Sequence, residues 1–283
     1  MQLTLPWPTQ RRVDDYFEAP WDQDDIPAYG GTIGTKAPNA VRLAGHNING
    51  TRLGLTARPQ DGSEEIDAMR SLGIDIMGLV ETNTNWSHVA RNTLAAMVRL
   101  AFGNNGNSVA SSAPSTAKSY LPGGTAMVAR GKVAGRVLKR VPDAQGRFSY
   151  MSFRGKRDTG IIVITVYRVC QKRGSKVGPD TAYMQQYHAQ RRDGTLHPDP
   201  RNRLLKDLTS LINEWQGKGF TPILMGDFNA DMDDNVFSDF VAEHDLIDVV
   251  DEMNDGTPPA YIRSRAPSTR LHPLPSPSQT SHH

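Results

Sequence analysis

The segment 222–230, PILMGDFNA, places a carboxylate and a carboxamide close together just past a short apolar run. We expect the run to be a buried strand, so Asp227 and Asn229 follow at its end. A carboxylate in that position can orient or deprotonate a water molecule, and a carboxamide can hold a phosphate oxygen without adding charge repulsion. This pair is therefore the first candidate for catalysis.

Polar side chains also stand at the expected ends of three other strands. Asn47 and Asn49 follow the alternating apolar residues of VRLAGHNING, Glu81 follows IDIMGLV, and Tyr167 ends GIIVITVY. In a layered α/β sandwich, strand ends on one edge converge on one cleft. A carboxylate such as Glu81 is a hard oxygen ligand suited to Mg²⁺ or Mn²⁺, and a tyrosine hydroxyl can steady a developing oxyanion. Together these residues fit metal-assisted attack of water on a phosphodiester.

Taken one at a time, each candidate also has a purely structural interpretation. The two asparagines could build a turn beside Gly50, and Glu81 could be a solvated strand end. Tyr167 could be a core aromatic residue. The aspartate and asparagine of GDFN could cap the following helix, although we expect that helix to begin only near Asn235. The functional interpretation therefore depends on the whole set.

Helices and apolar strands alternate along the chain. EEIDAMRSLG, NTLAAMVRLAF and NVFSDFVAEH have apolar residues at helical spacing, and PRNRLLKDLTSLINEWQ adds Pro200 in its first turn and Gly217 after its end. We expect GTAMVAR, FSYMSFR and GIIVITVYRV to be adjacent antiparallel strands of one sheet, and GNNGNSVASSAPSTAKS to be a loop. A helix that leads directly into a buried strand predicts an α/β (α+β) fold.

The composition predicts a globular intracellular protein. The chain has 283 residues, of which 37% are hydrophobic, enough for one large α/β domain or two small ones. Its net charge is +2, and the part after residue 40 is mildly basic, which weakly suits a phosphate-bearing substrate. A single cysteine, Cys170, excludes an intramolecular disulfide and a thiolate metal cluster. With no signal peptide and no apolar run near ~20 residues, we expect the nucleus or cytoplasm and no membrane partner.

The domain boundaries follow from changes in composition. Residues 1–38 are rich in Pro, Gly and Asp, so we expect a disordered N-terminal tail. Residues 39–265 carry the periodic apolar pattern of the folded domain. Residues 266–283 alternate Pro and Ser without such a pattern, and we expect a second disordered tail.

Five motifs in order, GHNING, DIMGLVETN, GGTAMVA, VITVYRVC and PILMGDFNA, resemble the endonuclease/exonuclease/phosphatase superfamily. The resemblance covers roughly residues 41–263. Each motif is weak by itself, but five in order with Gly-Asp-Phe-Asn among them make a strong signal. GLVETNTNW, TVYRVC and TAYMQQY look most similar to the branch of abasic-site endonucleases and non-LTR retrotransposon endonucleases.

The resemblance implies a role for each candidate. Glu81 would be the principal metal ligand, and Asn47 would line the metal and phosphate site. Tyr167 would stabilise the transition state. Asp227 would align the attacking water, and Asn229 would hold a phosphate oxygen. Substrate-binding residues would include Asn49, which stands where the family often has Asp or Asn.

The resemblance also implies a fold, a cofactor and a partner. The fold would be a four-layer α/β sandwich, two mixed sheets packed face to face with helices outside, here without its last strands. The cofactor would be Mg²⁺ or Mn²⁺, and the partner would be DNA, bound by a monomer. The activity would be metal-dependent phosphodiester hydrolysis of the retroelement endonuclease type. An inositol or lipid phosphate phosphatase of the same superfamily, and an inactive remnant, are the alternatives.

A cluster of basic residues could grip a nucleic-acid backbone. Its members are Lys172, Arg173, Lys176, Arg191 and Arg192. We include Lys172 and Arg173 among the substrate-binding candidates, although a solvated basic loop explains the charges equally well. His46, His188 and His244 lack metal-ligand spacing, so we expect them to be structural or exposed.

One part of the family pattern has no counterpart in this sequence. Beyond Gly-Asp-x-Asn the family carries Arg-x-x-Asp-[Tyr/Phe]-Ile-Leu and then Ser-Asp-His, whose histidine steadies the pentavalent phosphate. PPAYIRSR begins the expected approach, but APSTRLHPLP follows it, and His282 and His283 lack the aspartate. Loss of these groups predicts impaired catalysis.

A frameshift near Arg265 would explain this departure. One permitted codon set for APSTRLHP, read one nucleotide later, encodes Arg-His-Gln-Leu-Asp-Phe-Ile, which supplies the Asp-Phe-Ile of the expected motif. Residues 266–283 would then be out-of-frame translation. Sequencing the locus tests this hypothesis, because reads without the shifted Asp-Phe-Ile-Leu would contradict it.

Overall fold

A computed structural model describes residues 34–50, 64–88, 93–115, 120–156, 159–170, 181–230, 234–249 and 252. By its internal contacts the chain divides into two units. Ile33–Leu246 contains every helix and strand named below. Of the other unit, Met1–Thr32 with Ile247–His283, the described part is 247–249 and 252. The predicted tail 266–283, the segment PPAYIRSR and residues 1–33 lie outside the described residues.

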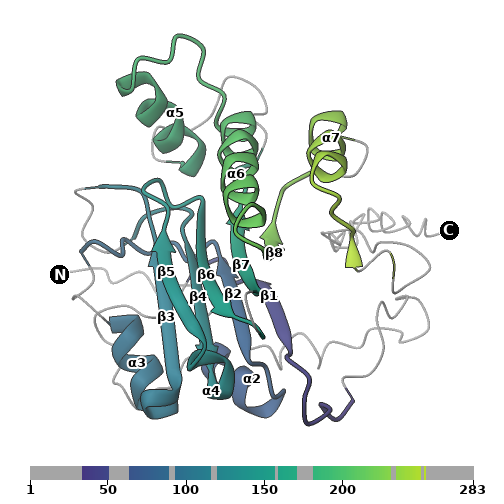
Figure 1. The fold of residues 1–283 in the computed structure, drawn as a ribbon. Coiled ribbons are helices and arrows are strands. Elements are labelled where there is room, and N and C mark those ends of the chain that lie inside the picture. The colour runs from purple at the N-terminus through teal and green to yellow at the C-terminus, as the bar shows by residue number, and fades with distance from the viewer. Residues whose placement is uncertain are drawn as a thin grey trace, which may run out of the picture. The chain divides into compact units, whose positions relative to one another are not determined.

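The first sheet has the strand order β1-β2-β4-β3 (Figure 1). Its strands are β1 Leu43–Asn47, β2 Ile76–Val80, β3 Gly106–Ser111 and β4 Thr125–Arg130. β1 and β2 run parallel, and the other pairs are antiparallel. All five residues of β2, IMGLV, are buried, as expected for a strand covered on both faces.

The second sheet has the order β5-β6-β7-β8. Its strands are β5 Val137–Pro142, β6 Phe148–Arg154, β7 Gly160–Tyr167 and β8 Phe220–Asp227. β7 and β8 are parallel, with Tyr167 paired to Asp227 in the last register position. Each sheet therefore contains one parallel pair whose strands end at two candidate site residues.

The two sheets pack face to face, with helices on both outer faces. Ile76 and Met127 of the first sheet meet Met151 and Val163 of the second in one buried cluster. Along the strands of the first sheet, outward-facing side chains alternate with these inward-facing ones. Helices α2 (Glu64–Ser71) and α3 (Thr93–Phe102) cover the outward-facing set. The predicted four-layer α/β sandwich is confirmed.

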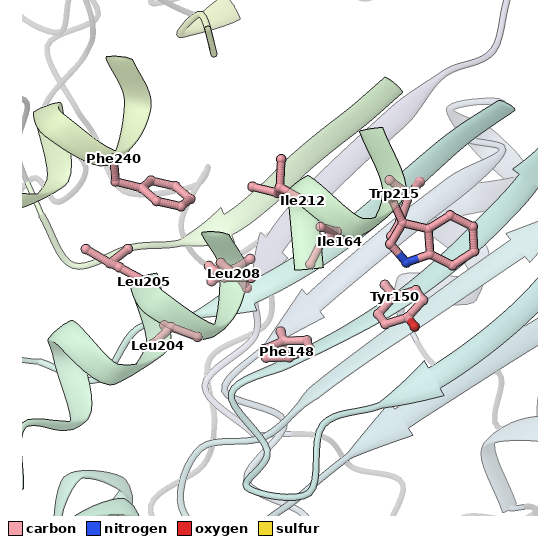
Figure 2. Close-up of a cluster of buried hydrophobic side chains, with 11 residues drawn as sticks. Phe148, Tyr150, Ile164, Leu204, Leu205, Leu208, Ile212, Trp215 and Phe240 are labelled. Carbon is pink, nitrogen blue, oxygen red and sulfur yellow. The ribbon is translucent and has the colours of Figure 1, made fainter. Parts of the chain in front are cut away.

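The outer face of the second sheet is covered by α6 (Pro200–Gln216) and α7 (Asn235–Glu243). Figure 2 shows the apolar stripe of α6, from Leu204 to Trp215, packed over Phe148, Tyr150 and Ile164. Fully burying one such side chain stabilises the fold by about 1.5–3 kcal/mol. This layer fixes the direction in which β7 and β8 reach the site.

Local signals set the ends of the helices that flank the site. The side chain of Asp199 accepts hydrogen bonds from the first backbone N–H groups of α6, Pro200 fits its first turn, and Gly217 follows its end, as the sequence predicted. Helix α5 (Ala182–Arg192) is capped by Thr181, whose hydroxyl accepts from the backbone N–H of Met184. Within the described residues, no helix is long and apolar enough to cross a membrane.

Two predictions about strands are wrong, although FSYMSFR and GIIVITVYRV are adjacent and antiparallel as expected. GTAMVAR forms β4 in the first sheet, whereas FSYMSFR and GIIVITVYRV form β6 and β7 in the second. The chain changes sheet after β4, through the short helix α4 (Gly131–Ala134) and β5. The expected loop after α3 contains β3, GNSVAS, because pairing with β4 and burial of Val109 outweigh its small, polar composition.

Strand β8 is an edge strand of the described sheet, since its only partner there is β7. Its residues are mostly half-buried, in contrast to the buried β7. An unpaired edge is a template for pairing with other chains.

Candidate active site

Four predicted residues lie at one edge of the sandwich because their strands end there. Asn47 is the last residue of β1 and is paired with Val80, which precedes Glu81. Tyr167 and Asp227 are the last residues of β7 and β8. Parallel neighbours end on the same edge, so each sheet contributes two of these side chains.

The amide of Asn47 joins the two sheets at this edge. Its Nδ2 donates a hydrogen bond to Oδ2 of Asp227 over 3.1 Å. Its Oδ1 accepts from the backbone N–H of Asn49 at 3.2 Å, so the turn interpretation is also correct. Asn47 therefore stabilises the turn with its amide oxygen and holds Asp227, the candidate water-orienting carboxylate, with its amide nitrogen.

Asp227 is fixed from its other oxygen as well. Oδ1 accepts from the backbone N–H of Asn229 at 2.9 Å. The preceding Gly226 has φ +139°, and a Cβ there would overlap the carbonyl of Val166, so only glycine allows this approach. Neither Asp227 nor Asn229 caps α7, whose N-cap is Asp234. The helix-cap interpretation of GDFN is therefore wrong.

Left-handed backbone conformations concentrate at this edge. Among the described residues, five non-glycine residues have positive φ, and four of them lie in the loops that follow β1, β2 and β8: Asn49, Glu81, Asn83 and Asn229. Asparagine tolerates this region, but glutamate at φ +53° is costly. Strain of this kind is characteristic of functional sites, where the surrounding structure holds it in place.

Asn49 belongs to a second chain of amides beside the carboxylates. Its Oδ1 accepts from Nδ2 of Asn83 at 3.4 Å, and Oδ1 of Asn83 accepts from the backbone N–H of Gly123 at 2.8 Å. No bond between Asn49 and Asp227 is present among the described residues. The structure therefore places Asn49 in the loop framework that holds Glu81.

Tyr167 is buried in a small cluster with Val80, Val169 and Ala182, so the core interpretation is correct too. Burial and the negative charge of Glu81 raise the pKa of its hydroxyl, which is close enough to that carboxylate to donate a hydrogen bond. Asp227 raises this pKa further. Tyr167 is therefore a neutral hydrogen-bond donor at physiological pH, as a residue that stabilises an oxyanion must be.

Asn229 is held by two partners that fix its amide plane. Its Nδ2 donates to the carbonyl of Arg168 at 2.7 Å, and its Oδ1 accepts from the Cys170 thiol at 3.2 Å. Burial, Glu81 and Asp227 raise the pKa of that thiol, so it stays protonated and serves as the donor. An amide nitrogen has two hydrogens, and one of them is used by Arg168.

Arg201 of α6 clamps the loops that carry these groups. Its guanidinium donates to the carbonyl of Val169 at 2.7 Å and to the carbonyl of Asn229 at 2.8 Å. It also lies 3.4 Å from Asp234, which pairs with the buried Arg168 at 3.2 Å. None of these residues was predicted from the sequence. Arg201 directly follows Pro200, which predicts the start of α6, but its partners come together only in the folded chain.

The donor set fits a hard divalent cation. Glu81 and Asp227 both act electrostatically on Tyr167 and on Cys170, so the two carboxylates face the same groups. Neither forms an ion pair with a lysine or arginine in the described part of the chain. Among those residues no group of three His, Cys, Asp or Glu side chains could hold a metal. Mg²⁺ requires fewer, because it is commonly bound by one or two carboxylates and retains several waters.

The remaining predicted residues lie elsewhere or outside the described residues. Lys172, Arg173 and Lys176 fall in 171–180, which the structure does not describe. Arg191 and Arg192 are exposed at the end of α5. His46 and His188 are exposed, and His244 is buried with its ring bonded to Thr209 Oγ1 at 3.0 Å, as expected for structural or exposed histidines.

Comparison with known proteins identifies one family. The sequence profile described as "Endonuclease/Exonuclease/phosphatase family" matches residues 44–278, which is most of the chain. No curated protein sequence was matched.

Several solved structures are similar to this chain at low sequence identity. AP endonuclease LMAP from Leishmania major is 13% identical, with a TM-score of 0.49 over 78% of this chain and 72% of that one. The APE2 catalytic domain from Xenopus laevis is 16% identical, with a TM-score of 0.42 over 71% and 66% of the two chains. An endonuclease/exonuclease/phosphatase family protein from Leptotrichia buccalis is 13% identical, with a TM-score of 0.40 over 72% and 73%.

Proposed function

Because the chain belongs to the endonuclease/exonuclease/phosphatase family, we propose that it is a metal-dependent phosphodiesterase that nicks DNA. The observation that carries the proposal is the pair of carboxylates, Glu81 and Asp227, that share one edge of the sandwich without a cationic partner among the described residues. Amides of Asn47 and Asn229 and the hydroxyl of Tyr167 surround this pair. Such a set suits attack of water on a phosphate ester.

Each of these five side chains has a role in the proposed reaction. Glu81, with Asn47 beside it, would hold a Mg²⁺ or Mn²⁺ ion, which when bound neutralises charge on the phosphate. Asp227, fixed by Asn47 and by the backbone of Asn229, orients the attacking water and accepts its proton. The remaining amide hydrogen of Asn229 holds a phosphate oxygen, and the neutral Tyr167 hydroxyl donates to the charge that develops on the phosphate.

The finer assignment to the retroelement endonuclease branch rests on the local sequences GLVETNTNW, TVYRVC and TAYMQQY. Lys172 and Arg173 remain proposed contacts to the nucleic-acid backbone. We also propose that the polypeptide with this sequence is slow, because it has no Ser-Asp-His motif. A positioned group of that kind typically contributes about 10²–10⁴-fold in rate.

A plasmid-nicking assay run beside a phosphate-release assay tests the proposal. Supercoiled plasmid and a set of inositol and lipid phosphates are each incubated with the protein and Mg²⁺. Slow nicking that is lost with EDTA and with Asp227→Ala supports the DNA nuclease. Phosphate release without nicking would instead support the phosphomonoesterase of the same family. Neither activity, in the presence of a folded protein, would support the inactive remnant.

A matched control separates catalysis from folding. Asp245→Ala removes an exposed aspartate that follows α7 and does not contact the site. It should nick at the wild-type rate. Equal loss in Asp227→Ala and Asp245→Ala would show that the assay reports stability alone.

A further inference from the structure

A polar pocket lies beside helix α5, on the side of the sandwich away from β1 and β8. Its volume is about 180 Å³. One wall is the segment 113–115, which follows β3, and a second is Gln145 in the turn between β5 and β6. The third wall is α5, through Gln185, His188, Ala189 and Arg192 among others.

The loops that line the pocket lie at the same strand ends as the candidate active site. The turn that holds Gln145 ends at Arg147, whose carbonyl accepts from the backbone N–H of Tyr167 at 2.7 Å. Segment 113–115 follows β3. The last residue of β3, Ser111, pairs with Thr125 of β4, and Thr125 in turn pairs with Val80 of β2. The walls of the pocket thus belong to the loops of the edge that carries Glu81 and Tyr167.

The strand order gives the lateral separation between the pocket and the candidate active site. From β7 to β5, and from β2 to β3, there are two strand spacings, which at ~4.8 Å each amount to about 10 Å. One strand of a stacked nucleic acid advances about 3.4 Å per nucleotide. A strand whose phosphate lies between Glu81 and Asp227 would therefore reach the pocket about three nucleotides away, or fewer where it is unstacked.

The chemistry of the walls suits a nucleobase. Amides at Gln145, Gln185 and Gln186 supply both donors and acceptors, as a base edge requires. Oε1 of Gln145 is buried and has no hydrogen-bond partner, which marks an unsatisfied acceptor in the wall. Pro114 and Ala189 add apolar surface for the ring face. Arg192, exposed at the rim, is placed for the adjoining phosphate.

The size of the pocket selects an unpaired base. A volume of about 180 Å³ lies below the ~300–1,000 Å³ of pockets that enclose drug-sized ligands, which leaves room for one ring system. We propose that this pocket binds one unpaired base of the nucleic-acid strand that is cut, a few nucleotides from the scissile phosphate. The inference rests on the proposed function and adds to it a substrate class, DNA with a single-stranded or flipped-out base.

Binding measured in EDTA tests the pocket without catalysis. Fluorescence anisotropy gives the Kd of the full chain for a single-stranded oligonucleotide and for a blunt, fully paired duplex of the same sequence. Ala189→Leu fills the pocket, and Arg192→Ala removes its rim charge. We expect Ala189→Leu to weaken single-strand binding about tenfold and to leave duplex binding within about twofold, because one recognised base contributes on this scale.

Two matched variants control for the substitutions. Ala242→Leu makes the same change at an exposed position of α7, and Arg99→Ala removes an exposed arginine of α3, which does not line the pocket. Both should bind as the wild type does. Oligonucleotides with 2-aminopurine at successive positions should show one position whose fluorescence changes on binding, and Ala189→Leu should abolish that change.

The outcomes separate the two proposals. Equal affinity of Ala189→Leu and Ala242→Leu for single strands, or equal weakening for single strands and duplex, would overturn the base pocket even if the wild type nicks plasmid. If Ala189→Leu does not fold, the comparison of Arg192→Ala with Arg99→Ala decides in the same way. Absence of nicking overturns the proposed function, while the binding measurements still report on the pocket.

Discussion

Nδ2 of Asn47 donates to Oδ2 of Asp227, a 3.1 Å hydrogen bond between residues 180 positions apart. Each residue ends an edge strand, β1 in one sheet and β8 in the other. The bond therefore closes the sandwich at the edge where the site lies. It also fixes the carboxylate that we propose as the water-orienting group, so the two roles can be separated by mutation.

A double-mutant cycle of Asn47→Ala and Asp227→Ala should show strong coupling. We expect Asn47→Ala to reduce nicking about 10–100-fold, because an unfixed carboxylate is misplaced by ~1 Å, and Asp227→Ala to reduce it at least 10²-fold. The double mutant should lose less than the product of the two single losses, since Asn47 acts in part through Asp227, which it holds in place. Urea unfolding should give a coupling free energy of about 1 kcal/mol. Additive rate losses would show that Asn47 acts independently.

Replacing Glu81 with glycine should stabilise the protein while removing its activity. Glutamate at φ +53° costs about 1–2 kcal/mol, and glycine removes this cost but adds about 0.5–1 kcal/mol of unfolded-state entropy. We expect a net gain of up to about 1 kcal/mol in the free energy of unfolding, measured in urea without metal. Mg²⁺-dependent nicking should fall at least 10²-fold, because the principal ligand is lost.

Asp245→Gly is the matched control for that experiment. Asp245 has nearly the same backbone conformation, φ +49°, at the end of α7. It should gain less stability, because aspartate tolerates the left-handed region better than glutamate, and it should keep the wild-type nicking rate. Loss of activity in both variants would show that backbone relaxation, and not the missing carboxylate, is responsible.

Arg201→Ala should weaken catalysis through the position of Asn229. The guanidinium holds the carbonyls of Val169 and Asn229, and its loss leaves those acceptors without this donor. We expect a 10–100-fold slower nicking rate and a loss of about 2 kcal/mol of stability. Arg201→Lys should not rescue either property, because an ammonium cannot reach two carbonyls in fork geometry.

Arg203→Ala serves as the control on the same helix. Arg203 is exposed and forms an ion pair with Asp207 one turn away, which contributes little to stability. It should change the nicking rate less than twofold. If Arg203→Ala slows the reaction as much as Arg201→Ala, the effect belongs to α6 as a whole and the clamp is not responsible.

Local signals explain what the sequence could predict. Pro200, Gly217 and the apolar spacing between them identify α6, and the run before Gly-Asp-Phe-Asn identifies β8, because these signals act over a few residues. The family motifs add the common edge on which Glu81 and Tyr167 lie. The four-layer fold follows from the alternation of such elements.

Long-range contacts explain what the sequence could not predict. The sheet that β4 joins depends on pairing partners and not on its own residues, and β3 is a strand only because β4 lies beside it. The contacts of Arg201 with Val169 and Asn229 join positions 32 and 28 residues away. The left-handed conformation of Glu81 has no local signal, since glutamate does not favour it.

Tyr167 predicts how stability changes in alkaline solution. Its pKa is raised in the folded state, mainly by burial and then by Glu81, whereas in the unfolded chain it is near 10. Above about pH 10 the unfolded chain therefore loses a proton that the folded chain keeps, so the free energy of unfolding falls as pH rises; below about pH 10 this contribution is fully present. Tyr167→Phe has no proton to lose at this position.

We therefore expect the stability of the wild type to decrease relative to Tyr167→Phe by about 1 kcal/mol between pH 10 and pH 11, because the unfolded chain is about half deprotonated at pH 10 and one pH unit corresponds to ~1.4 kcal/mol only for a whole proton. The two proteins are compared by urea unfolding at pH 8, 10 and 11, and the pH 8 difference gives the contribution of the hydroxyl itself. A Tyr187→Phe variant, which changes a partly exposed tyrosine of α5, provides the control and should follow the wild type. A constant difference between wild type and Tyr167→Phe at all three pH values would mean that the hydroxyl ionises as easily in the folded protein as in the unfolded chain. The neutral donor proposed for the reaction would then have to be abandoned.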